Sequence, residues 1–216
     1  MFSMIRHHQI KIFVVGPFQA GKTTIVHLLD PKAFSIEREY YEGNTRVSTT
    51  VGFDLGKLIW LHDDNDEILD ASTFKETYRN VNIDGCEVWE VFLFGAPGQM
   101  RFQDTREAVS KGSDGVLFII DSTKPGQVGH VLALFEEVKM FLGDYIPIVV
   151  VANKQDLEDA LKAEEIRGVL KLNNVKVVEA SAIKGEGVRE ALIELLKMIR
   201  EVKLRKNKEL EVVSDV

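Results

Sequence analysis

The chain has 216 residues, 45% hydrophobic and 28% charged, which is typical of one compact domain with a full core. Its net charge of −7 argues against a nucleic-acid-binding surface and against constitutive contact with an anionic membrane. The single cysteine, Cys86, excludes an internal disulfide and favours a reducing compartment. No apolar run reaches the roughly 18 residues of a membrane span, and neither end carries a lipidation motif. We therefore expect a cytoplasmic protein without a stable membrane anchor.

A phosphate-binding loop is predicted near the start of the chain. Residues 16–23 read Gly-Pro-Phe-Gln-Ala-Gly-Lys-Thr, between an apolar run over 10–15 that predicts a strand and a helical pattern over 24–29. The backbone N–H groups and the helix N-terminus of such a loop bind phosphate anions. Lys22 is expected to reach the outer phosphates and the Thr23 hydroxyl to bind Mg²⁺. The predicted contacts to the nucleotide from this loop are Gly16, Gln19, Ala20, Gly21, Lys22, Thr23 and Thr24.

The next third of the chain predicts a loop, a strand and a hairpin. Residues 32–48 are polar and aperiodic, and predict a mobile loop. Residues 55–61 predict a strand, and the acidic start of the segment 62–80 predicts a solvated loop. Asp84-Gly85 predicts a hairpin turn between residues 81–83 and a strand over 86–94.

The remaining segments alternate between helices and strands. Helices are expected over 100–111, with Arg101 and Arg106 exposed, and over 128–142, 163–172 and 187–203 or beyond, with frayed residues at 212–216. Strands are expected over 115–120, 148–152 and 176–179. This alternation builds a mostly parallel sheet covered on both faces, with ligands at the carboxyl ends of its strands. We expect one domain, with a core over 10–203, an insertion over 62–80 and a C-terminal tail over 204–216.

A guanine-binding motif follows the strand predicted over 148–152. With Asn153-Lys154-Gln155-Asp156 the chain resembles the Ras/Arf-like small GTPases, whose motif is Asn-Lys-x-Asp, and the resemblance spans about 10–203. Asp156 can accept two N–H groups of guanine, the Lys154 stem can lie over the base, and Asn153 can brace the loops. Ser181-Ala182-Ile183 is similar to the family's Ser-Ala-Lys motif, with the Ala182 N–H expected at guanine O6.

The resemblance implies a fold and its cofactors. The fold is α/β: a three-layer G domain of the P-loop NTPase class, with a mostly parallel central sheet, one antiparallel edge strand and helices on both faces. The implied cofactors are GTP or GDP and Mg²⁺.

In this family a threonine in the first switch loop binds Mg²⁺ and senses the γ-phosphate. Thr50, within Thr-Val-Gly-Phe-Asp, is similar to the Arf-type Thr-Ile-Gly-Phe-Asn. Residues 78–85 are similar to the second strand and hairpin of Ras, which would nominate Thr77 instead. We prefer Thr50, because the segment 62–80 is then an insertion into a hairpin loop, where extra length costs little.

The second switch departs from the family pattern Asp-x-x-Gly. The chain has Gly95-Ala96-Pro97-Gly98, so the acidic residue that normally holds a Mg²⁺-bound water is absent. Gly98 remains to sense the γ-phosphate, and Gln99 stands where the family orients the attacking water. Asp54 is the nearest acidic residue that could replace the missing carboxylate as a metal ligand. The alternative is that Asp54 is a surface charge on an edge strand.

These departures are similar to the prokaryotic MglA-like branch of the family. In that branch an arginine of the first switch loop can enter the site, and Arg46 lies in the corresponding loop; a solvated loop arginine is the alternative. Phe18 and Gln19 stand where Ras has glycines, and their bulk should hinder an arginine supplied by a partner, so slow intrinsic hydrolysis is expected. The resemblance implies effector and regulator proteins that bind the switch loops, among them a roadblock-type regulator.

Three functions remain open from the sequence. The leading hypothesis is a Mg²⁺-dependent GTPase switch. The second is a pseudo-GTPase scaffold that binds guanine nucleotide without hydrolysing it, which Gly95 favours and Gln99 opposes. The third, a P-loop kinase or ATPase, is opposed by the motif at 153–156.

Overall fold

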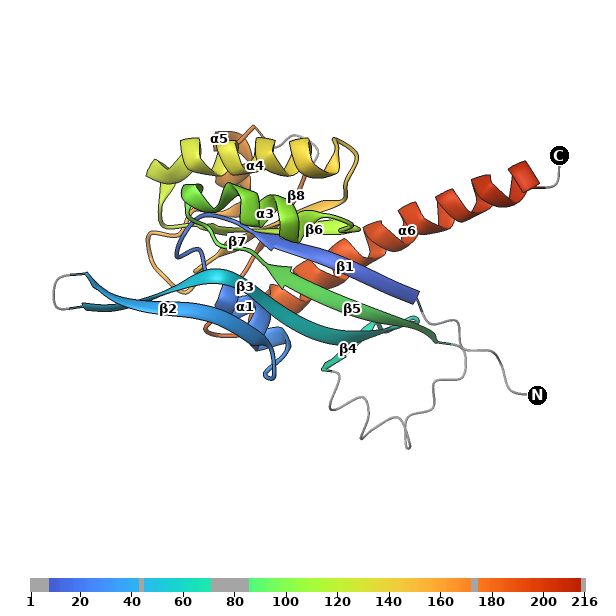
Figure 1. Ribbon diagram of the computed structural model, residues 1–216, viewed down its shortest axis with the longest axis horizontal. Helices are drawn as coiled ribbons and strands as arrows, with labels where there is room; N and C mark the ends of the chain where they lie inside the picture. Colours follow the sequence, from blue (N-terminus) through green and yellow to red (C-terminus); the bar gives the residue numbers. More distant parts are fainter. Residues whose placement is uncertain (1–7, 43–44, 71–85, 172–174, 215–216) are drawn as a thin grey trace.

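The computed structural model describes residues 8–42, 45–70, 86–171 and 175–214; in 37–42, 45–52 and 207–214 it describes the backbone alone. One sheet forms the middle layer of the molecule (Figure 1). Its strands are β1 (His8–Val15), β2 (Phe34–Glu42), β3 (Thr45–His62), β4 (Glu67–Asp70), β5 (Glu87–Gly95), β6 (Gly115–Asp121), β7 (Ile148–Asn153) and β8 (Lys176–Glu179).

The strand order is β2-β3-β5-β1-β6-β7-β8, with β4 also paired to β3. The strands β5, β1, β6, β7 and β8 are parallel to one another. At the edge, β3 runs antiparallel to β5, and β2 and β4 pair antiparallel with β3. This confirms the predicted fold class, a mostly parallel sheet with an antiparallel edge. The carboxyl ends of β1, β6, β7 and β8 therefore meet at one edge of the sheet.

Helices cover both faces of the sheet, as predicted. Helices α1 (Lys22–Leu29) and α6 (Val188–Ser214) lie on one face, and α3 (Gln103–Ser110), α4 (Val128–Leu142) and α5 (Ala163–Val169) on the other (Figure 1). Two short 3₁₀ segments, η1 (Met100–Phe102) and η2 (Pro125–Gln127), precede α3 and α4. Within the described residues, no helix combines the length and apolar character that crossing a bilayer requires.

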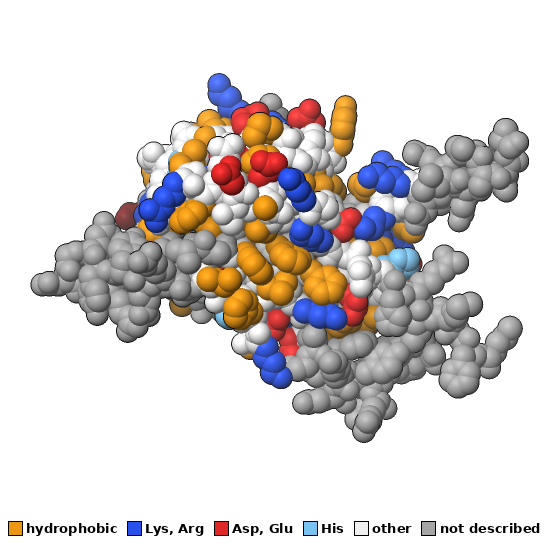
Figure 2. Space-filling view, viewed as in Figure 1, with side chains coloured by type: hydrophobic (Ala, Val, Ile, Leu, Met, Phe, Trp, Pro, Cys, Tyr) orange, Lys and Arg blue, Asp and Glu red, His pale blue; other side chains and the backbone are white. Residues whose placement is uncertain are grey.

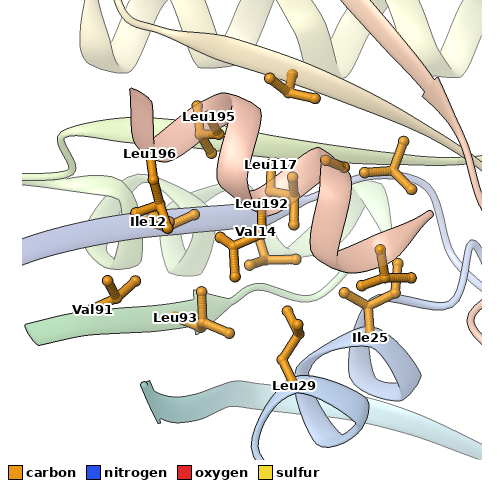
Figure 3. Packing of buried hydrophobic residues seen from close by; sticks show 14 of the residues in the cluster. Ile12, Val14, Ile25, Leu29, Val91, Leu93, Leu117, Leu192, Leu195 and Leu196 are labelled. Carbon is orange, nitrogen blue, oxygen red and sulfur yellow. The ribbon is translucent and has the colours of Figure 1, made fainter. Parts of the chain in front are cut away.

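Strand β1 is buried on both faces, because its successive side chains point to opposite sides and helices cover both sides. Ile12 and Val14 point toward Leu192 and the following leucines of α6 (Figure 3). Phe13 and Val15 belong to the second core, which α4 and α5 cover. The phosphate loop therefore leaves the sheet from a strand fixed by packing on both sides.

The first switch region is a hairpin, so the mobile loop predicted for residues 32–48 is wrong. Strands β2 and β3 pair from Phe34 opposite Leu55 to Glu42 opposite Thr45, with one irregularity near Ser35. The segment is polar, but it is rich in aromatic and β-branched residues, which favour strands. Polarity alone therefore does not distinguish a loop from a polar hairpin.

Two other predictions are corrected. Residues 67–70, within the predicted solvated loop, form β4 against residues 58–61 of β3. Helix α6 continues to Ser214, through residues predicted to be frayed. Residues 81–83, the turn at Asp84-Gly85 and the rival switch residue Thr77 lie outside the described part of the chain. The division into core, insertion and tail stays a prediction.

An apolar surface lies over β3 and β5, beside α3 (Figure 2). Phe92 and Phe94 of β5 are half-buried there. The ammonium of Lys57 lies 5.2 Å from the ring centre of Phe92, and that of Lys11 lies 4.6 Å from the ring centre of Phe94. These basic side chains thus lie over the half-buried aromatic rings.

Candidate functional site

The phosphate loop joins β1 to α1 and requires glycine at two positions. A Cβ on Gly16 would lie 1.9 Å from the Ile119 carbonyl oxygen, and one on Gly21 would lie 2.3 Å from Asn153 Nδ2. Gly21 also has φ of 99°, which side chains rarely adopt. Ala20 is buried in this loop, whereas Gln19 and Thr24 are exposed. The loop is thus closely packed against the neighbouring strands at its glycines.

Lys22 is buried at the start of α1, with 7% of its surface exposed. Its Nζ donates to the carbonyl oxygens of Gly16 at 2.9 Å and Pro17 at 2.8 Å. Burial lowers the pKa of Lys22 to about 8; the nearby Asp54 carboxylate opposes this change, and the Arg106 guanidinium adds to it. A buried ammonium held by its own loop in this way is a ready partner for a phosphate anion.

Asn153, at the end of β7, joins two of the predicted ligand loops. It is 2% exposed, and its Nδ2 donates to the Ala20 carbonyl at 2.8 Å. Its Oδ1 accepts from the Ala182 N–H at 2.9 Å. The structure therefore brings the phosphate loop, the motif at 153–156 and the loop at 181–183 together, at the carboxyl ends of β1, β7 and β8.

Asp156 is oriented by a neighbouring loop. It accepts a hydrogen bond from Ser181 Oγ, which is the main cause that holds the pKa of Asp156 below its ordinary value. Ile183, in the lysine position of the family motif, is 83% exposed. The carboxylate is thus ionised and fixed in direction, and Ile183 has apolar surface free to meet a ligand.

Asp121, at the end of β6, was missed in the sequence. Lys154, whose φ is 71°, donates from Nζ to Asp121 Oδ2 at 2.6 Å. Burial alone would raise the pKa of Asp121, but the hydrogen bonds from Lys154 and Thr123 hold it below its ordinary value. Asp121 is the last residue of a buried strand, as Asn153 is, so its position at a strand end was the available signal.

Asp54 lies beside the position of the missing acidic residue. The β3–β5 ladder pairs Asp54 with Gly95, and a Cβ on Gly95 would lie 2.7 Å from Asp54 Oδ2 and 3.0 Å from Asp54 Cβ. Asp54 is 1% exposed and accepts from Thr23 Oγ1 at 2.9 Å. The alternative of a surface charge is therefore wrong: the carboxylate fills the space that a side chain at position 95 would need.

This pair of oxygen donors fits a magnesium ion. Hydroxyl and carboxylate oxygens are hard ligands of the kind Mg²⁺ prefers, and Mg²⁺ in nucleotide sites is bound by one or two protein groups plus phosphates and waters. In the described ranges, no group of three or more His, Cys, Asp or Glu side chains could hold a metal on its own.

The two predicted residues of the first switch lie in the β2–β3 hairpin. In the ladder, Thr50 is opposite Glu37 and Arg46 is opposite Tyr41. The structure describes only the backbone there, so the roles of Thr50 and Arg46 stay predictions.

The second switch packs directly on the phosphate loop. A Cβ on Gly98 would lie 2.5 Å from the Pro17 carbonyl carbon and 2.6 Å from Lys22 Nζ, so a glycine is needed at this contact. Gln99 follows and precedes η1. Arg106, predicted to be exposed, is only 1% exposed, because it forms an ion pair with Glu137 of α4. The sequence of residues 100–111 alone carries no information about this partner, which lies on another helix.

Replacement of Gly95 by alanine tests the position of Asp54. The added methyl group would displace the Asp54 carboxylate, so we expect Gly95→Ala to lower the free energy of unfolding by about 1–3 kcal/mol in urea titrations. Gly129→Ala is the matched control, because a Cβ on Gly129 in α4 meets nothing within 4 Å. Equal stabilities of Gly95→Ala and the unchanged protein would contradict the described contact.

The chain is similar to known proteins over most of its length. The Ras family profile matches residues 11–201. Mutual gliding-motility protein MglA of Myxococcus xanthus is 28% identical over 200 residues, which cover 90% of this chain and 92% of that protein. ADP-ribosylation factor-like protein 6 of Danio rerio is 25% identical over 210 residues, covering 92% and 93%. ADP-ribosylation factor-like protein 1 of Saccharomyces cerevisiae is 26% identical over 207 residues, covering 91% of each chain.

Proposed function

Because the chain belongs to the Ras family of small GTP-binding proteins, we propose that it is a molecular switch that binds GTP or GDP with Mg²⁺ and hydrolyses GTP slowly. The observation that carries this proposal is the pair of hydrogen bonds made by Asn153. They link the phosphate loop to the loop that contains Ser181 and Ala182, so one ligand can contact phosphate-binding and base-binding groups together.

On binding, polar groups of the nucleotide would replace partners that these side chains now have within the protein. Lys22 would turn from the carbonyls of its loop to the outer phosphates, and the loop N–H groups would donate to them. Asp156, kept ionised by Ser181, would accept two N–H groups of guanine that adenine lacks. Lys154, held by Asp121, would lay its stem along the base.

Thr23, Asp54 and Thr50 are the proposed protein groups around Mg²⁺. Thr23 and Asp54 are in contact, whereas Thr50 would join them only after the hairpin changes its pairing. When bound, the ion supplies positive charge that neutralises the phosphate oxygens. The buried Asp54 is proposed to take over the part of the absent carboxylate at position 95, from the neighbouring strand.

Hydrolysis would depend on three groups near the γ-phosphate. Gln99 is proposed to orient the attacking water, and the Gly98 N–H to donate to the phosphate. Arg46 is the proposed arginine that enters from within the chain, and it lies in the β2–β3 ladder. We expect a slow rate, because the ladder would have to open and because the bulk of Phe18 and Gln19 should hinder an arginine supplied by a partner.

The switch itself would be a choice between two uses of the same hairpin. In one state Thr50 pairs with β2, and in the other it contacts Mg²⁺ and the γ-phosphate. The difference in contacts between GTP and GDP biases this choice, and a protein that binds the hairpin can sense it. Effectors and regulators in the cytoplasm, including one of the roadblock type, are the proposed partners, and the apolar surface of β3 and β5 adjoins the hairpin.

A pseudo-GTPase scaffold is the second candidate, and Gly95 is the observation that favours it. The contact between Asp54 and Thr23 weakens this alternative, because a carboxylate is present beside the metal position although it comes from another strand.

The base preference is tested by Asp156→Asn. The amide can donate a hydrogen bond where the carboxylate only accepted, so we expect the affinity for GDP to fall by about 100-fold or more and the preference to shift toward xanthosine diphosphate. Competition against a fluorescent guanine nucleotide measures both. Asp159→Asn, an exposed carboxylate after the same motif, is the control. Unchanged selectivity of Asp156→Asn would remove the guanine assignment.

The metal assignment is tested by moving the carboxylate across the ladder. Asp54→Asn should raise the Mg²⁺ concentration needed to slow GDP release by about tenfold or more. The double variant Asp54→Gly with Gly95→Asp returns one carboxylate to the same space, and it should restore most of the Mg²⁺ dependence. GDP release from Asp54→Asn with the Mg²⁺ dependence of the unchanged protein would show that Asp54 does not serve the metal.

A further inference from the structure

Arg106 of α3, which is buried, forms an ion pair with the partly buried Glu137 of α4. Arg106 Nε donates to Glu137 Oε2 at 2.8 Å, and Nη2 donates to Oε1 at 3.0 Å. Arg106 is 1% exposed. Two parallel hydrogen bonds of this kind fix the plane of the guanidinium, which stays charged in the interior.

The other N–H groups of Arg106 hold the second switch. Nη1 donates to the carbonyl oxygens of Gln99 at 2.7 Å and Pro97 at 3.3 Å, and Nη2 donates to that of Met100 at 3.4 Å. One side chain thus binds three carbonyls within four residues. Glu137 orients the guanidinium, and the guanidinium orients the backbone of residues 97–100.

The same contacts set the direction of the backbone N–H groups. The described peptide bonds are all trans, and in a trans peptide the C=O and N–H bonds point in opposite directions. Because the Pro97 carbonyl faces Arg106, the Gly98 N–H faces away from it. The Gly98 backbone meanwhile touches Pro17 and Lys22 of the phosphate loop. The loop is therefore held between Arg106 and the phosphate loop.

We propose that Arg106 and Glu137 are positioning residues for GTP hydrolysis, which tie the loop 97–100 to α4 and so fix where Gln99 and the Gly98 N–H lie. The proposal rests on the proposed function. Stability alone is a weak reason for such a pair, because apolar side chains of similar size usually stabilise a protein as well as a buried ion pair does. Precise orientation of the loop is what the charged, planar group adds.

Single-turnover GTP hydrolysis and GDP affinity separate positioning from binding. Arg106→Lys keeps the charge without the fork, and Glu137→Gln weakens the hold on the guanidinium. We expect each to lower the hydrolysis rate by about tenfold or more, with GDP affinity changed by less than about threefold, because small displacements of a catalytic group cost rate. Arg101→Lys is the matched control, since Arg101 is exposed and its guanidinium lies over the Phe102 ring. It should leave both quantities unchanged.

Hydrogen exchange tests, independently of catalysis, whether Arg106 and Glu137 hold the loop 97–100; we call these contacts the clamp. The amides of residues 98–102 should exchange faster in Arg106→Lys and Glu137→Gln than in Arg101→Lys, while the amides of β6 stay protected and report an intact fold. The double variant Arg106→Met with Glu137→Leu leaves no unpaired charge. We expect it to fold, to bind GDP and to hydrolyse GTP more slowly than the unchanged protein, by about tenfold or more.

Two results would overturn the proposal: unchanged exchange at 98–102 in the single variants, or hydrolysis by the double variant within about twofold of the unchanged protein. A protein that binds no guanine nucleotide, or does not hydrolyse GTP, would instead contradict the proposed function. The exchange data would then still decide whether the clamp exists.

Discussion

The site depends on the side-chain amide of Asn153. Its two hydrogen bonds run to different loops, and the Ala182 N–H can only donate, so Oδ1 must face Ala182 and Nδ2 must face Ala20. Both polar ends are satisfied, so burial of the amide stabilises the arrangement. The close approach of Gly21 to the same amide leaves no room for a side chain there. Glycine at position 21 is thus required by the contact between the loops, apart from any role in the proposed phosphate binding.

The antiparallel edge of the sheet adapts the site to an altered second switch. Asp54 and Gly95 are cross-strand neighbours, so a carboxylate from one strand can occupy the space that the other leaves empty. Strand β3 also continues into the hairpin with β2, so Asp54 and the first switch belong to one continuous strand. The loop 95–99 is held from the opposite side by Arg106. Asp54, the first switch and the second switch are therefore connected through the paired strands β3 and β5.

Local patterns in the sequence were sufficient for the fold class, for the strands at 115–120, 148–152 and 176–179 and for the helix at 128–142. These segments are buried runs or amphipathic helices, in which period and length carry the information. The β2–β3 hairpin was not predictable in this way, because its two strands are polar and show no regular apolar period. The burial of Asp54 and Arg106 depends on Gly95 and Glu137, which are distant in sequence. Asp121 could have been found from its place at a strand end.

The proposal of a Mg²⁺-dependent GTPase is best tested by single-turnover hydrolysis of GTP, with and without Mg²⁺ and beside an ATP control. We expect a slow loss of GTP that requires Mg²⁺ and that ATP does not match, because we propose that Asp156 selects the base and that Thr23 and Asp54 hold the metal. Tight binding of GTP without hydrolysis would contradict the enzymatic part of the claim and favour a nucleotide-dependent scaffold. Equal hydrolysis of ATP, or no binding of GTP, would contradict the claim as a whole.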